Sequence, residues 1–433
     1  MSLSYRQPGV VLTDRHFTVP LDHADPGGET IELYAREAVA SDKADRELPW
    51  LLYLQGGPGF GANRFVGRQA WLDRALKEYR VLLLDQRGTG RSTPVNRQTL
   101  PLRGGPAAQA DHLARFRADS IVRDCEAIRP GITGGAPWTT LGQSFGGFCT
   151  LTYLSFFPEG LSTSVITGGL PALDAHADDV YRAAYPRMER KVAAHYARYP
   201  MDVERARRIA EHLLDHETVL PNGYRLTVEA FQSLGLMLGM SDGSHRLHFL
   251  LEDAFVRTPA GAELSDAFQE QVQGLLSYAG NPLYALLHEP LYGQDTRPTA
   301  WAAERVRAEF PQFDAAKSLA GDTPVLFTGE TVHPWVFDTD PALRPLKEAA
   351  ELLAARTDWQ PLYDPARLAV NEVPVAAAVY HDDLYVDAGH SLRTARAVRG
   401  LRTWVTDEFE HDGLRTGAPR VLDRLLALAR DEA

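Results

Sequence analysis

A serine flanked by glycines is the first group in this sequence that could perform chemistry. Ser144 is the centre of Gly-Gln-Ser-Phe-Gly, residues 142–146. Between a strand and a helix, a Gly-x-Ser-x-Gly pattern holds the serine hydroxyl up on a tight turn, as a nucleophile requires. A loop in which Ser144 only caps the following helix would have the same composition. The two interpretations differ in what they require elsewhere, because a serine nucleophile needs an oxyanion hole, a base and an acid.

Oxyanion-hole donors are backbone N–H groups, and the residue after the nucleophile, Phe145, is expected to supply the first. The second should come from a loop after an earlier strand. Residues 55–59, Gln-Gly-Gly-Pro-Gly, follow an apolar run of strand length at 49–54. Their glycines let the backbone approach a substrate closely, although a plain tight turn would look similar. We expect Gly57 to be the second donor, with Gly56 as the alternative.

Two histidines compete for the role of the base. The run 373–380 is strand-like, and Asp383 follows it as a candidate acid. The base must then follow the next strand, since the acid precedes the histidine in the chain order of such sites. His390 follows Asp383 too closely for a helix and a strand to intervene, whereas His411 leaves room for both. The spacing therefore favours His411.

The acid has two alternatives. Asp382 is adjacent to Asp383, which is favoured because the apolar residues 384–386 continue inward from it. Glu330 ends another strand-like run, 324–330, but its use would leave the strand 373–380 without a role. The predicted triad is Ser144, Asp383 and His411.

Strands and helices alternate along the first part of the chain, which predicts a mostly parallel α/β sheet with helices on both faces. Strand-like runs precede residues 55 and 85, as well as the serine motif, and an antiparallel pair is expected before residue 49. From about residue 171 helical patterns dominate, and the alternation resumes after residue 365. We predict an α/β core formed by residues 1–170 and 366–433, interrupted by a helical cap at 171–365.

Composition narrows the class of protein further. A net charge of -12 and a pI near 5.6 argue against a nucleic-acid surface and against binding to an anionic membrane. No apolar run approaches the roughly 18 residues of a membrane span. The first residues carry no export-signal pattern, and Cys125 and Cys149 form neither a metal-type spacing nor a disulfide framework. A cytoplasmic enzyme with no metal site is expected.

Three motifs, in this order, resemble the proline iminopeptidase (prolyl aminopeptidase) family of α/β-hydrolases. They are residues 55–59, Asp-Gln-Arg-Gly-Thr-Gly-Arg-Ser at 85–92, and 142–147. The chain length, the long insertion and residues 408–415 resemble the larger-subunit branch of that family, although Gln55 stands where many members have histidine. The resemblance implies an α/β-hydrolase fold with a helical cap, and removal of N-terminal proline from peptides without a cofactor. The motif at 85–92 is interpreted as a brace of the oxyanion loop, with Arg87 binding carbonyls of that loop.

The implied substrate carries a protonated imino group, which needs a carboxylate partner once it is buried. Glu289, Glu252 and Glu330 are the candidates, because each lies among apolar residues; helix-terminal or ion-paired acids would look the same. The candidate walls of a proline-ring pocket are Phe145, Tyr292, Trp335 and Phe337. Two other functions stay open: an esterase or amidase acting on small non-peptide substrates, and a non-catalytic ligand-binding protein of hydrolase fold. The sequence also leaves open whether the chain forms a homo-oligomer.

Overall fold

The computed structural model describes residues 3–259 and 261–432, and its centre is a nine-stranded sheet in the order β1-β2-β3-β5-β4-β6-β7-β12-β13. The strands are β1 (Leu3–Gln7), β2 (Val10–Pro20), β3 (Thr30–Ala40), β4 (Trp50–Leu54), β5 (Arg80–Asp85), β6 (Trp138–Gln143), β7 (Leu161–Thr167), β12 (Val375–Tyr380) and β13 (Leu401–Thr406). The pairs from β1 to β3 and the β3–β5 pair are antiparallel, and all pairs from β5 to β13 are parallel. The predicted fold class is confirmed.

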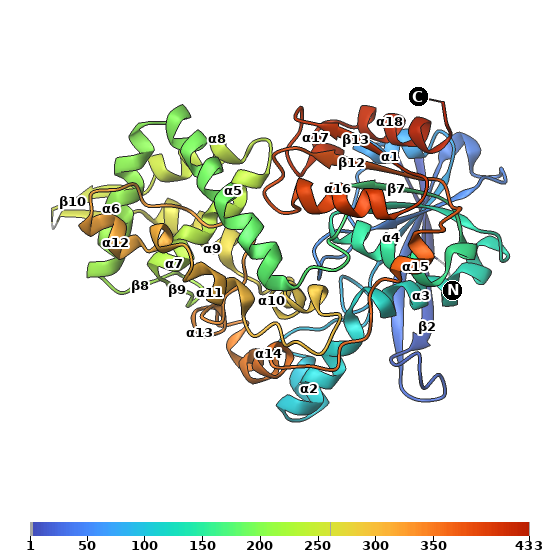
Figure 1. Cartoon of the computed structure of the whole chain (residues 1–433), viewed down its shortest axis with the longest axis horizontal. Helices are drawn as coiled ribbons and strands as arrows, with labels where there is room; N and C mark the ends of the chain where they lie inside the picture. Colours follow the sequence, from blue (N-terminus) through green and yellow to red (C-terminus); the bar gives the residue numbers. More distant parts are fainter. Residues whose placement is uncertain (1–2, 260, 433) are drawn as a thin grey trace.

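The central strands are apolar throughout because both of their faces are covered. Alternate residues of β4 belong to different clusters: Leu51 packs on one face of the sheet and Leu52 on the other. The first face is covered by α1 (Ala70–Ala75) and α18 (Arg420–Ala429), and the second by α3 (Ala118–Thr133) and α4 (Phe145–Phe156). Figure 1 shows this sheet and its helices on the right, with the N-terminal strands in blue and the C-terminal elements in red. The carboxyl ends of the parallel strands therefore meet at one edge, where a site can form.

The helical insertion lies between β7 and β12, which are neighbours in the sheet. Its main helices are α5 (Ala177–Arg198), α6 (Met201–Asp215), α7 (Val228–Gln232), α8 (Gly243–Glu252), α9 (Asp266–Leu276), α10 (Pro282–Leu287), α11 (Ala302–Arg307), α12 (Ala315–Ala320), α13 (Val336–Thr339), α14 (Lys347–Ala354) and α15 (Pro365–Leu368). A 3-10 segment, η5 (Ser233–Gly239), joins α7 to α8, and two short hairpins, β8–β9 (Thr218–Val219, Arg225–Leu226) and β10–β11 (Phe255–Thr258, Gly261–Leu264), lie at its rim. Figure 1 shows most of these helices on the left of the molecule, with α14 at the bottom near α2 (Pro106–Leu113) and α15 on the right beside α4.

The hydrophobic clusters do not follow the chain order of the insertion. One cluster is formed mainly by buried residues between 177 and 327, together with Leu384 and Tyr385 of the core. Buried residues between 283 and 291 and between 332 and 368 instead pack with the sheet, α3 and α4. The later part of the insertion is thus fastened to the core, and the boundaries 171–365 stay a prediction.

The strand-like run at 324–330 forms no strand. Its backbone groups find other partners: Thr328 N donates to the carbonyl of Gln232 at 2.8 Å, and the Gln232 amide donates to the carbonyl of Leu326 at 2.7 Å. The segment is therefore tied to the end of α7, and it brings Glu330 to the interior.

Candidate active site

Ser144 lies at the sharp turn between β6 and α4. Its φ and ψ angles are 54° and −123°, a conformation that non-glycine residues rarely adopt. The glycines around it are required by close packing: a Cβ at Gly146 would lie 1.9 Å from the carbonyl oxygen of Leu54. The Ser144 side chain makes no capping bond to α4, although the serine stands at the N-cap position. The turn therefore presents the hydroxyl to the surroundings and does not use it to cap the helix.

Asp383 and His411 come from the loops that follow β12 and β13. His411 donates its Nδ1–H to Asp383 Oδ2 at 2.7 Å, and α16 (Ala388–Ala397) and β13 intervene between them in the chain. The other oxygen of Asp383 accepts the backbone N–H groups of Tyr385 at 2.8 Å and Val386 at 3.1 Å. With Nδ1 occupied in this way, Nε2 of His411 is the nitrogen left to act as a base.

The competing residues have other surroundings. The carboxylate of Asp382 is exposed and pairs with the neighbouring His381 at 3.1 Å. His390 lies in the first turn of α16, where its backbone N–H bonds to Asp387 and its ring contacts Arg393. Neither Asp382 nor His390 lines the cavity that contains Ser144 and His411.

The environment of His411 favours its protonated form. The ring is 4 % exposed, and burial alone would lower its pKa. The charge of Asp383, the hydrogen bond to it, and the negative charges of Glu330 and Asp412 together outweigh burial, so the pKa of His411 lies above its ordinary value. A histidine held in this way can store the proton that a serine loses during attack.

The glycine loop after β4 lies against the serine turn. Gly56, Gly57, Ser144, Glu330 and His411 line one cavity of about 380 Å³. A Cβ at Gly56 would lie 2.9 Å from the Cβ of Ser144, and Gly57 has φ 138°, a region that favours glycine. Because Phe145 is the first residue of α4, its N–H has no acceptor within the helix. This arrangement suits an oxyanion hole.

The loop is braced by the motif at 85–92, but not through Arg87 as expected. Gln86 Nε2 donates to the carbonyl of Gln55 at 3.1 Å, and Asp85 Oδ1 accepts the N–H of Ala62 at 2.8 Å. Gln55, at the position where the family resemblance implies histidine in many members, has a buried side-chain oxygen with no partner within the described residues.

Arg87 instead fastens other segments together. The side chain is fully buried and forms a two-pronged ion pair with Asp124 of α3, with Nε lying 2.7 Å from Oδ2. It also donates to the carbonyl oxygens of Leu21 at 2.9 Å and Arg115 at 2.6 Å. The prediction that Arg87 binds the oxyanion loop is wrong. The buried carboxylate of Asp124 binds the guanidinium instead and holds it against α3.

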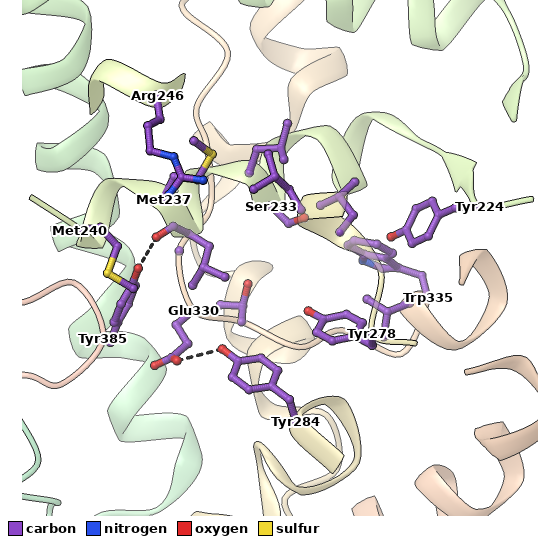
Figure 2. A pocket seen from close by; sticks show the side chains of 17 residues that line it. Tyr224, Ser233, Met237, Met240, Arg246, Tyr278, Tyr284, Glu330, Trp335 and Tyr385 are labelled. Atoms are coloured by element: carbon purple, nitrogen blue, oxygen red, sulfur yellow. Dashed lines mark hydrogen bonds between the residues drawn. The ribbon is translucent and has the colours of Figure 1, made fainter. Parts of the chain in front are cut away.

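Of the three candidate glutamates, Glu330 is the one that the structure brings to the cavity. Its Oε1 accepts the hydroxyl proton of Tyr284 at 2.8 Å, and the carboxylate also lines an adjoining pocket of about 160 Å³ (Figure 2). The two cavities share seven lining residues, namely Leu236, Met240, Leu275, Tyr278, Tyr284, Glu330 and Tyr385. Glu330 therefore lies at the junction of the cavity that contains Ser144 and a largely apolar recess.

The expectations for Glu252 and Glu289 as substrate-binding residues are corrected. Glu252 ends α8 at the surface, where it pairs with Arg205 at 3.1 Å, and it lines neither cavity. Glu289 is 3 % exposed and accepts the N–H groups of Ala302 and Ala303 at the start of α11. Burial raises the pKa of Glu289 to about 7 although those N–H groups act in the opposite direction. Both oxygens of its carboxylate accept hydrogen bonds from α11, so the structure assigns Glu289 to capping this helix.

The proposed pocket walls are also partly revised. Trp335 lines the recess, whereas Phe145, Tyr292 and Phe337 line neither cavity. Tyr278, Tyr284 and Tyr385 line both, and sequence reasoning missed them. The sequence does point to Tyr385, because a residue two positions after the predicted acid Asp383 is expected to lie near the site. Nothing in the sequence points to Tyr278 or Tyr284, because the helical patterns of the insertion do not show which helix face meets the core.

Within residues 3–259 and 261–432, no helix combines the length and apolarity needed to cross a bilayer.

The fold and the site together define the class. A parallel sheet with a serine on a strained turn, followed in chain order by an acid and a histidine, is the arrangement of an α/β-hydrolase. A family model described as alpha/beta hydrolase fold matches residues 49–254.

Comparisons over the whole chain are more specific. A proline iminopeptidase from Aeromonas sobria is 50% identical over 430 residues, covering 99% of this chain and 99% of the relative. A proline iminopeptidase from Aspergillus aculeatus is 38% identical over 439 residues, covering 99% of this chain and 96% of the relative. The chain belongs to the proline iminopeptidase family, as its motifs indicate.

Proposed function

We propose that this protein is a serine exopeptidase that releases an N-terminal proline from peptides. The observation that carries the proposal is the presence of a carboxylate, Glu330, in the same cavity as Ser144 and His411. A hydrolase of neutral esters has no need of a negative charge beside its nucleophile. A substrate with a protonated terminal imino group does need one, because burial of an unpaired ammonium costs several kcal/mol. The two relatives that match this chain over nearly their full length are both named proline iminopeptidases, which supports the same substrate class.

In this proposal His411 Nε2 takes the proton of Ser144 Oγ as the oxygen attacks the carbonyl carbon of the terminal proline. The backbone N–H groups of Phe145 and Gly57 stabilise the oxyanion. His411 then gives its proton to the departing amine, and the C–N bond breaks to leave a prolyl ester on Ser144. A water molecule, deprotonated by His411, attacks this ester; His411 then returns the proton to Ser144 Oγ as the ester C–O bond breaks and free proline leaves. Asp383 keeps the imidazole oriented and balances its positive charge.

Glu330 orients the substrate by its amino end. Its carboxylate would bind the protonated imino group, and Tyr284 keeps that carboxylate in place through the 2.8 Å hydrogen bond. The pyrrolidine ring would then lie against the apolar side chains that the two cavities share, of which Leu236, Met240 and Tyr385 are examples. A blocked or acylated proline could not form the ion pair, so the enzyme would act on free termini only.

A substrate panel tests the proposal. Proline, alanine and leucine β-naphthylamides are compared with N-acetylproline β-naphthylamide and with p-nitrophenyl acetate and butyrate. We expect the highest kcat/KM for the free proline compound and loss of activity on its acetylated form. Hydrolysis of the esters alone would instead identify an esterase, and no turnover of any compound would indicate a binding protein that has kept the fold.

The site of action in the cell is part of the proposal. Cys125 and Cys149 are both buried free thiols, which suits a reducing, cytoplasmic setting. Peptides with N-terminal proline would be the small partners of the enzyme, and no nucleic-acid partner is proposed in view of the net charge of -12.

A further inference from the structure

A short part of the cap, residues 236–241, runs directly over the loops that carry His411 and Asp383. We refer to it as the cap strap. The backbone N–H of His411 donates to the carbonyl oxygen of Gly239 at 3.1 Å. The hydroxyl of Tyr385, two residues after Asp383, donates to the carbonyl oxygen of Leu236, a bond drawn in Figure 2. The candidate base is thus held by the cap as well as by the core.

The residue after the histidine strengthens this attachment. Asp412 is 6 % exposed, and its Oδ1 accepts both the backbone N–H of Ser241 at 3.1 Å and the Ser241 hydroxyl at 2.6 Å. Arg415 forms ion pairs with Asp412 and with Asp242, the next residue of the cap. Hydrogen bonds to a charged acceptor are stronger than neutral ones, so this contact resists separation of the cap from the histidine loop.

Packing leaves the strap no room to shift independently of the site. A Cβ at Gly239 would lie 2.3 Å from the ring of Tyr385, so the strap backbone lies directly on that ring. The same ring meets His411 edge-on, with centroids 4.7 Å apart and an interplanar angle of 68°. Displacement of the strap would therefore move Tyr385 and release His411 from two of its neighbours.

We propose that Ser241 and Tyr385 are positioning residues, which hold His411 in its reactive orientation through the cap strap. In this view the cap does more than shape the substrate pocket: the base is fully ordered only while the strap is docked. Ser241 touches no reacting atom and acts through Asp412 and the histidine loop. The inference rests on the role of His411 in the proposed function, but it does not depend on which substrate the enzyme accepts.

The test measures the reactivity of Ser144 without any peptide substrate. Phenylmethylsulfonyl fluoride forms an O–S bond with the serine and loses fluoride, and the serine proton passes to His411. The second-order rate of this sulfonylation therefore reports how well the histidine is placed. We expect Ser241→Ala and Tyr385→Phe each to slow it on the order of tenfold, since small misplacements of a catalytic group have effects of this size or larger. Ser241→Thr, which keeps the hydroxyl, should retain most of the wild-type sulfonylation rate.

Matched variants within the cap separate positioning from general loosening. Ser265→Ala removes a serine that accepts the N–H of Phe268 at the start of α9, and Tyr196→Phe removes a buried hydroxyl that donates to the carbonyl of Val325 at 2.6 Å. Both should lower the melting temperature and leave the sulfonylation rate unchanged. If Ser241→Ala and Tyr385→Phe slow sulfonylation no more than these controls do, the proposal is overturned. A wild-type enzyme that is sulfonylated normally but does not hydrolyse proline naphthylamide would contradict the proposed function instead.

Discussion

Replacement of Glu330 by glutamine is the most direct test of substrate recognition. Glutamine keeps the size of the side chain and an oxygen that can accept the Tyr284 hydroxyl, which lies 2.8 Å from Glu330 Oε1. Only the negative charge is lost. That charge also helps to raise the pKa of His411, so a change in activity is assigned to the interaction with the substrate only where it is larger for a charged substrate than for an uncharged one.

The size of the effect follows from the surroundings of Glu330. Two opposite charges about 4 Å apart at an effective dielectric constant near 20 attract each other by about 4 kcal/mol. Part of this is offset because both groups lose water, and hydrogen bonds to charged groups have net values of about 1.5–3 kcal/mol. Since 1.4 kcal/mol corresponds to a factor of ten, kcat/KM for proline β-naphthylamide should fall roughly 10- to 150-fold.

The assay compares two substrates that differ in one atom. Cyclopentanecarboxylic acid β-naphthylamide has the proline ring with carbon in place of the charged nitrogen. Glu330→Gln should leave its kcat/KM within about twofold, as no ion pair forms with the wild type. Glu252→Gln, at a surface carboxylate paired with Arg205, is the matched control and should change neither substrate. Equal losses on both substrates, or no loss on proline, would refute the assignment of Glu330.

Two further predictions concern the histidine and the buried arginine. Because the pKa of His411 is raised and the base must be neutral, activity should fall as the pH drops through a value above 6.5. Asp383→Asn should move this acid limb to lower pH and reduce kcat on the order of 10⁴-fold, as measured in pH–rate profiles; an unmoved limb would contradict the pairing. Arg87→Leu should lower the unfolding free energy by about 3–5 kcal/mol in urea titrations, because Asp124 is left charged and buried. A loss below about 1 kcal/mol would show that His23, whose Nε2 lies 2.8 Å from Asp124 Oδ1, compensates for the missing guanidinium.

The sequence predicted the fold and the arrangement of the triad because both depend on chain order. The order of strands along the chain predicts Asp383 and His411 as a pair, and in the structure they are hydrogen-bonded to each other, with His411 lining the cavity that contains Ser144. Their catalytic roles remain a prediction. The glycine loop was recognised from its composition, since close approach of backbones leaves few alternatives to glycine.

The cap was less predictable, because a glutamate flanked by apolar residues in the sequence can cap a helix, form a surface ion pair or line a cavity. Glu289 caps α11, Glu252 ends a surface helix, and Glu330 reaches the cavity, yet all three have similar local sequences. The run 324–330 also has the composition of a strand, and only the amide of Gln232 on a distant segment shows why it is not one. Such outcomes depend on tertiary contacts that no local pattern encodes.

The position of the insertion also has a consequence for biosynthesis. Ser144 precedes the cap, whereas Asp383 and His411 follow it, because residues 168–374 separate two strands that are neighbours in the sheet. A ribosome adding 5–20 residues per second needs on the order of 10 to 50 s to pass from Ser144 to His411. During that interval the nascent chain has a serine without a proton acceptor. A peptidase built in this order cannot cleave anything until His411 has been made, and the cap strap, although made earlier, can dock only then.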